Sequence, residues 1–171
     1  MRATRTLLPW AAALLIAGVF LDSLRFKFTG HPTPEHIFTT LRDWSGVELF
    51  YPLGPWIIGL SELVSAGLVL VLPLVLVLRG RAHTAQGLQW LGALIGIGVM
   101  SGAIVFHLFT PLGISTPVEW ADGAPTAYSA ALFGSACATW LACALILWMR
   151  RGAVPAWLPV VGRPAAAPTA L

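Results

Sequence analysis

The stretch Leu88–Leu112, LQWLGALIGIGVMSGAIVFHLFTPL, contains no Asp, Glu, Lys or Arg in 25 residues. A helix needs about 20 mainly apolar residues to cross the hydrocarbon core of a bilayer. The stretch therefore predicts a membrane-spanning helix, and it indicates that the rest of the chain belongs to a membrane protein.

Three further apolar segments are long enough to span, at about residues 7–24, 55–78 and 127–149. The whole chain is 57% hydrophobic and 10% charged, with a mean hydropathy of +0.81. Soluble domains carry roughly a quarter charged residues. The sequence therefore predicts an all-α polytopic membrane protein, an antiparallel four-helix transmembrane bundle formed by residues 1–151. An Ala/Pro-rich tail is expected at residues 152–171.

The basic residues divide unequally between the two ends of these segments. Three lie on one side, Arg25, Lys27 and Arg42. Seven lie on the other, Arg2, Arg5, Arg79, Arg81, Arg150, Arg151 and Arg163. Because cytoplasmic loops carry the excess of Lys and Arg, both termini are expected in the cytoplasm of a bacterial-type inner membrane. No basic run is interleaved with aromatic residues, so the chain is expected to bind the lipid bilayer and not nucleic acid.

The loop at residues 25–54, expected outside, is rich in aromatic residues and differs from a flexible linker. Its centre predicts a short helix, with Thr33 as the cap, Pro34 at the first position and Glu35 in the first turn. Phe38 and Leu41 would share an apolar face. Two interpretations stay open, a functional cover over the bundle and a plain helix at the membrane surface.

Small residues in the third segment predict close helix packing. Gly92 and Gly96 form one G-x-x-x-G pattern, and Gly98 and Gly102 form another. Such patterns let helix backbones approach each other, either inside the bundle or between two copies of the chain. Pro73 is expected to kink the second segment.

Placing an ionisable residue at membrane depth costs free energy, so each such residue is expected to have a structural or functional role. At 1.5 Å per residue, Glu62 lies roughly 10 Å below the outer end of its helix. Asp22 and His107 lie near the outer ends of the first and third helices, and the antiparallel order places all three in the outer half. The sequence predicts a polar pocket there, lined by Glu62, His107, Lys27, Asp22 and Ser65. A purely structural lock between Glu62 and a basic residue is the alternative.

Few residues could hold a metal or a covalent cofactor. Cys137 and Cys143 are six apart, which places them on different sides of a helix and outside any redox or zinc spacing. His107 is the one histidine inside a span, whereas a bis-histidine haem needs two. No metal site and no covalently bound cofactor are predicted.

Three motifs carry a family resemblance over roughly residues 7–149. They are Arg25-Phe-Lys27-Phe after the first helix, Gly59-Leu-Ser-Glu62 in the second, and His107-Leu-Phe-Thr-Pro111 at the end of the third. In these the chain resembles DoxX-like and MauE-type small integral membrane proteins. The resemblance implies a recurrent polar pair, which falls on Lys27 and Glu62, and a redox-associated role.

The resemblance favours binding of a quinone or a small solute in the outer pocket, together with a partner protein. A non-catalytic accessory subunit of a larger respiratory or photosynthetic complex is the alternative, and a small-solute or proton carrier is a third. Other membrane subunits or further copies of the chain are the expected partners. Enzymatic activity is left open.

Overall fold

Helices form most of the chain. The computed structural model describes residues 2–154, with side chains from residue 7. The elements in chain order are α1 (Arg2–Phe28), α2 (Pro32–Ser45), the 3-10 turn η1 (Glu48–Phe50), α3 (Leu53–Ala66), the π-helical segment η2 (Gly67–Val71), α4 (Leu72–Leu78), α5 (Ala82–Phe109), the strands β1 (Thr116–Ala121) and β2 (Ala124–Ser129), α6 (Ala131–Met149) and the 3-10 turn η3 (Arg151–Ala153).

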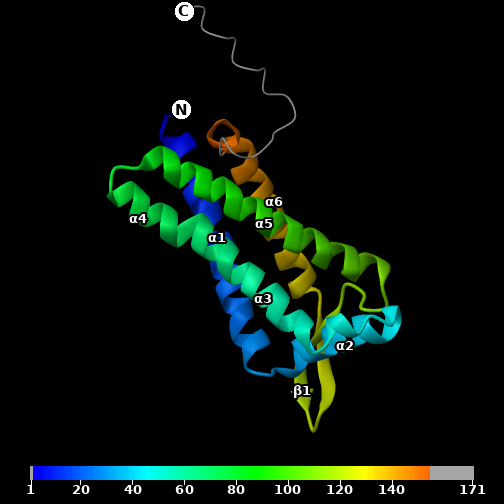
Figure 1. The fold of residues 1–171 in the computed structure, drawn as a ribbon. Coiled ribbons are helices and arrows are strands. Elements are labelled where there is room, and N and C mark those ends of the chain that lie inside the picture. The colour runs from blue at the N-terminus through cyan, green and yellow to red at the C-terminus, as the bar shows by residue number, and fades with distance from the viewer. Residues whose placement is uncertain (1, 155–171) are drawn as a thin grey trace, which may run out of the picture.

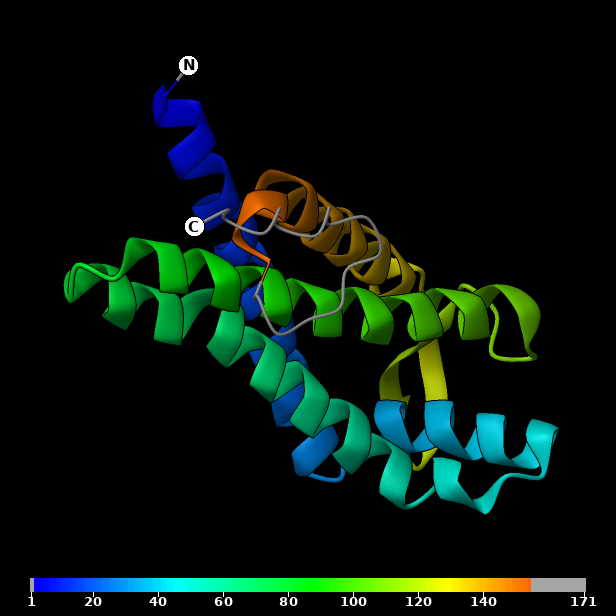
Figure 2. The same cartoon turned by 45° about the horizontal axis from the view of Figure 1, so that its top comes forward.

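Four helical stretches are long and apolar enough to cross a membrane. They are Leu7–Phe28, Leu53–Leu78, Ala82–Phe109 and Ala131–Met149. Each runs opposite to the one before it, so that the start of α1, the α4–α5 turn and the end of α6 lie at one end of the molecule (Figure 1). The short helix α2 and the β1–β2 hairpin lie at the other end, as the turned view also shows (Figure 2).

The four stretches pack in a ring, in which α1 contacts α3 and α6, and α5 contacts α3, α4 and α6. The core of this ring includes Ile16 and Phe20 of α1, Val69 of η2, and Cys143 and Ile146 of α6, all fully buried. Only 28% of the most apolar window is buried in each of the last three stretches. Most of their apolar side chains therefore face outward, which is the distribution expected for a bundle in lipid.

Close contact between α5 and the second stretch depends on one glycine pair. A Cβ on Gly92 would lie 2.8 Å from Leu68 and Val69, and one on Gly96 would lie 3.0 Å from the Ser65 hydroxyl of α3 and 2.9 Å from the Cys143 sulfur of α6. The other pair behaves differently, because nothing lies within 4 Å of the Cβ position of Gly98 or Gly102. The first G-x-x-x-G pattern is thus used for packing inside the chain.

The helix bounds differ from the expected ones at three points. α1 continues to Phe28, because its last turn packs on α3, where Phe28 stacks on Trp56 at 4.7 Å. α5 runs from Ala82 to Phe109 and not from 88 to 112, since Pro111 forces the residue before it into an extended conformation. α6 begins at Ala131 and not at 127, because residues 124–129 form β2.

The hairpin was missed by the sequence interpretation. β1 and β2 pair antiparallel through a two-residue turn at Asp122 and Gly123, both with positive φ, 50° and 77°. That is the conformation that Asp-Gly favours in a tight hairpin. The Asp-Gly pair was the signal in the sequence that could have revealed it.

The helix α2 begins two residues earlier than expected, and its cap is different. His31 is the N-cap residue, and its Nδ1 accepts a hydrogen bond from the Thr33 backbone N–H at 3.2 Å. The first helical proline is Pro32 and not Pro34. The Thr33 hydroxyl is not free to cap, because it donates to the Pro117 carbonyl at 3.1 Å and accepts from the Trp120 indole at 2.9 Å. These bonds fasten α2 to the hairpin.

Candidate functional site

A buried ion pair joins α1 to α3 in the half of the bundle that carries α2. The Lys27 ammonium lies 2.9 Å from both carboxylate oxygens of Glu62, with side-chain exposures of 12% and 3%. Lys27 also donates to the Ser23 hydroxyl one turn earlier in α1. The two charges are therefore compensated within the protein, and the pair carries no net charge.

The local sequence brings these two residues together. Lys27 stands in the last turn of α1, where the helix dipole favours a positive charge. Gly59, one turn before Glu62, lets α1 approach, because a Cβ there would lie 2.6 Å from the Phe28 ring. Lys27 can then reach the carboxylate across the helix interface.

A cavity of about 570 Å³ lies beside this pair. Its walls come from α1, α2, α3, α5 and α6, with Val47, Leu49 and Phe50 before α3, and Leu112 and Val118 at the hairpin. Most of the lining is apolar, including Phe20, Ile58, Met100 and Phe106. Cavities that bind small molecules have this size and this mixture of apolar walls with a few polar groups.

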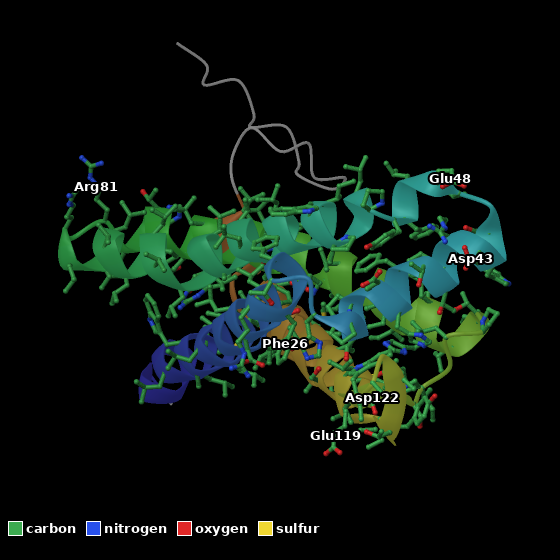
Figure 3. The ribbon with its side chains drawn as sticks, turned by 90° about the horizontal axis from the view of Figure 1, so that it is seen from below. Phe26, Asp43, Glu48, Arg81, Glu119 and Asp122 are labelled. Atoms are coloured by element: carbon green, nitrogen blue, oxygen red, sulfur yellow. The ribbon has the colours of Figure 1, made fainter. Side chains whose placement is uncertain are left out.

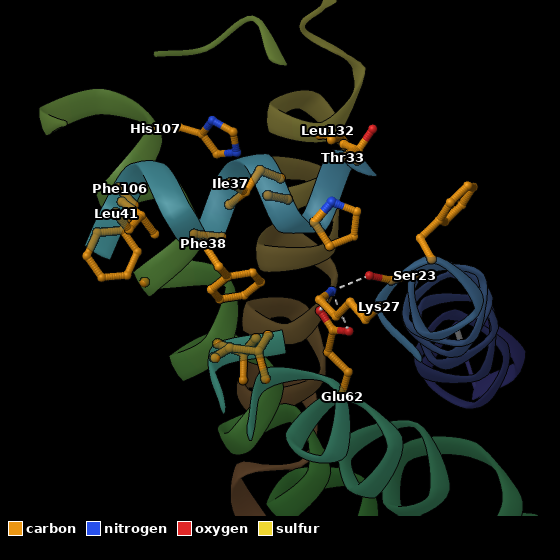
Figure 4. A pocket seen from close by; sticks show the side chains of 18 of the residues that line it. Ser23, Lys27, Thr33, Ile37, Phe38, Leu41, Glu62, Phe106, His107 and Leu132 are labelled. Carbon is orange, nitrogen blue, oxygen red and sulfur yellow. Dashed lines mark hydrogen bonds and ion pairs between the residues drawn. The ribbon is translucent and has the colours of Figure 1, made fainter. Parts of the chain in front are cut away.

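The polar side chains lie at two separate places on the wall. Ser23, Lys27 and Glu62 meet on one side, and His107 projects from α5 on another, with Ile37 and Phe38 of α2 between them (Figure 4). His107 is 7% exposed, and its Nδ1 lies 2.6 Å from the Gly113 carbonyl. A carbonyl only accepts hydrogen bonds, so Nδ1 carries the proton of this contact.

Two of the five expected site residues do not contribute as expected. Ser65 does not line the cavity, because it faces α5 and its hydroxyl donates to the Gly92 carbonyl at 2.8 Å. Asp22 borders the cavity, but its carboxylate pairs with Arg25 at 2.9 Å on the surface, where the two side chains are 59% and 68% exposed. Glu62, Lys27 and His107 remain the polar lining residues that the sequence identified.

The helix α2 forms one wall of the cavity. Pro34, Phe38 and Leu41 are buried, and all three line the cavity with Ile37. Phe38 rests on Gly54 of α3, where a Cβ would lie 2.5 Å from its ring. The apolar face of α2 thus packs on the bundle and closes one side of the cavity.

A second group of buried polar residues lies at the opposite end of the molecule. Gln89 of α5 donates to the Val69 carbonyl at 3.3 Å and accepts from the Arg150 Nε at 3.0 Å. In a regular α-helix the Val69 carbonyl would accept from residue 73, which is a proline without an N–H. Gln89 therefore replaces a donor that Pro73 removes, and the group is structural.

Within residues 2–154, no cluster of three or more His, Cys, Asp or Glu side chains is placed to hold a metal ion. Comparison of the chain with family models, with curated proteins and with solved structures found no match. The resemblance to DoxX-like proteins stays a prediction from the three sequence motifs.

Proposed function

We propose that this chain is an integral membrane protein that binds a small, mainly apolar molecule with a polar head, in a cavity in the outer half of its helix bundle. A quinone is the class of ligand that best fits an apolar cavity with few polar groups. In this proposal the quinone carries electrons, and a partner membrane protein exchanges them. The chain itself supplies binding and orientation.

The observation that carries the proposal is the 570 Å³ apolar cavity beside the buried Lys27–Glu62 pair. Burying two charges costs several kcal/mol per ion before their attraction is counted, at the order-of-magnitude level. Here the ion pair lies on the wall of a cavity between the four spanning stretches. This arrangement is expected of a site that orients the head group of a ligand.

The charge distribution supports the proposed orientation in an inner membrane. Arg79, Arg81, Arg150 and Arg151 lie at one end of the described chain, and no acid lies with them. Figure 3 shows Arg81 at the end opposite Asp43 and Glu48, with Glu119 and Asp122 on the hairpin. Positive residues favour the cytoplasmic side, so the cavity would open toward the outside.

A matched pair of glycine variants tests the proposal. Gly102 lines the cavity, whereas Gly98 lies one turn earlier in α5 and does not line it, and both have open space at the Cβ position. Gly102→Phe is expected to fill the cavity and weaken decylubiquinone binding by about tenfold or more, which is about 1.4 kcal/mol. Gly98→Phe is expected to bind like the unmodified chain.

Binding is measured by native mass spectrometry of the purified full chain released from detergent micelles, titrated with decylubiquinone. Retained binding in Gly98→Phe together with loss in Gly102→Phe supports the cavity as the site. Equal binding by both variants, or no binding of either decylubiquinone or its reduced form, decylubiquinol, by the unmodified chain, overturns the proposal.

A further inference from the structure

The Lys27–Glu62 pair and His107 offer a ligand in the cavity hydrogen-bond acceptors and no donor. An ammonium group has three protons to donate. Lys27 directs them at the two Glu62 oxygens and the Ser23 hydroxyl. No proton of Lys27 is left for a ligand, although the group is the obvious donor on this wall.

Glu62, in contrast, keeps unused acceptor positions. Each carboxylate oxygen has about two lone-pair directions, and Lys27 takes one on each. The ion pair therefore offers a ligand acceptors and no spare ammonium proton.

His107 presents an acceptor as well. Its Nδ1–H donates to the Gly113 carbonyl, so in the neutral ring the lone pair is on Nε2. No partner for Nε2 is found among the described residues, although the side chain is more than nine-tenths buried and lines the cavity. An accessible acceptor on the wall of an apolar cavity can take a hydrogen bond from a ligand, and such a bond contributes about 0.5–1.5 kcal/mol.

The remaining polar side chains on the wall add two donors, the Ser23 hydroxyl, which accepts from Lys27, and the Nε2–H of His31. Thr33 has no proton left to donate, since its hydroxyl donates to Pro117 and accepts from Trp120. The Ser135 hydroxyl donates to the Leu132 carbonyl at 2.8 Å. His31 accepts at Nδ1, which leaves an Nε2–H donor, and it lies at the rim that this cavity shares with a second, smaller one.

We infer that the cavity selects an apolar molecule bearing a hydroxyl group, a phenol or a quinol, whose O–H donates to His107 Nε2. This deepens the proposed function and rests on it. A quinone carbonyl cannot donate to His107, and an ether oxygen cannot either. The reduced, hydroxylated form of a quinone is therefore the form that the site would hold.

A pair of probes that differ only in this proton tests the inference. 4-Octylphenol and 4-octylanisole have the same ring and chain, but the anisole carries a methyl ether in place of the hydroxyl. Both can accept from His31, and only the phenol can donate. At pH 8, where imidazole is ordinarily neutral, we expect the full chain to bind the phenol about tenfold more tightly by native mass spectrometry.

Variants of His107 locate the selecting group. His107→Phe removes the acceptor and keeps an apolar ring, so the preference for the phenol is expected to fall to about twofold or less. His107→Gln keeps a side-chain carbonyl acceptor and is expected to retain most of the preference. His83→Phe, the same substitution at an exposed position away from the cavity, is the matched control and is expected to leave the preference unchanged.

The outcomes separate the inference from the proposed function. If neither probe binds the unmodified chain, the cavity is not a ligand site and the proposed function fails. If both bind equally, the cavity is a ligand site and the inference alone is wrong. That comparison needs no variant, so it stands even if His107→Phe does not fold. Decylubiquinol against decylubiquinone then tests the same preference on a matched redox pair, and tighter quinone binding would overturn the inference.

Discussion

At the scale of residues, the buried charges of Lys27 and Glu62 depend on each other, because each compensates the other. Removing one partner leaves the other charge buried without compensation, which costs about 3–5 kcal/mol. Glu62→Gln is therefore expected to lower the free energy of unfolding by about that amount, measured by SDS titration in mixed micelles. In the double variant Lys27→Met/Glu62→Gln the loss is expected to shrink to about 1 kcal/mol, because no unpaired charge remains.

The exposed pair Asp22–Arg25 is the control for this prediction. It is also a pair of opposite charges with a 2.9 Å separation, but it lies within one helix and both side chains are more than half exposed. Exposed pairs contribute about 0–1 kcal/mol, so Asp22→Asn is expected to change little. A Glu62→Gln variant as stable as Asp22→Asn would contradict the ion-pair account.

How much of the site the sequence could predict is also decided residue by residue. The depth of Glu62 follows from the helical rise, and its position near the end of α1 follows from the antiparallel order. A basic partner, Lys27 or Arg25, could therefore be predicted, and only the family resemblance singled out Lys27. Ser65 could not be placed, because its direction depends on the rotation of α3 about its axis. That rotation is set by contacts such as Gly59 on Phe28 and Gly92 on Val69.

At the scale of elements, the irregular centre of the second stretch depends on α5. The π-helical segment Gly67–Val71 is followed by Pro73, and Gln89 donates to the Val69 carbonyl. Gln89→Leu leaves that carbonyl and the Arg150 Nε without this partner. We expect a loss of about 1–3 kcal/mol in the free energy of unfolding, read from the same SDS titration.

Restoring the missing backbone donor is expected to reduce that loss. In Pro73→Ala, residue 73 regains an N–H for the preceding turn, so Gln89→Leu is expected to cost at least about 0.5 kcal/mol less in this background. Gln86→Leu, one turn earlier in α5, is the control and is expected to stay within about 0.5 kcal/mol. Equal costs of Gln89→Leu in the two backgrounds would show that Pro73 and Gln89 are not coupled.

The elements at the α2 end show where sequence interpretation stops. Long apolar stretches predict spanning helices from composition alone, and all four are present. The hairpin and the start of α2 depend instead on contacts between distant segments, such as Trp120 with Thr33. No local sequence pattern indicates such a contact. The Asp-Gly turn was visible in the sequence, but its flanking strands are short and lack a clear alternation of apolar and polar residues.

At the scale of the whole molecule, the fold places all its acidic residues in the half that carries α2 and the hairpin. At the other end of the described chain, every Asp, Glu, Lys or Arg position is a basic residue. Such an asymmetry sets the orientation of a bundle with short loops. The same orientation decides from which side a ligand would reach the cavity. An outward-facing hairpin would place the cavity in the outer leaflet, and the reverse orientation would place it on the cytoplasmic side.

Single cysteines at the two ends test this orientation. Cys137 and Cys143 are first replaced by alanine, which suits their small and partly or fully buried positions. Ala121→Cys beside the hairpin turn is then expected to react with a membrane-impermeant maleimide in intact bacterial cells, because that exposed residue would face outward. His83→Cys, exposed in the first turn of α5, is expected to react only after lysis. Labelling of His83→Cys in intact cells, with Ala121→Cys protected, would place the cavity on the cytoplasmic side and require a ligand delivered from there.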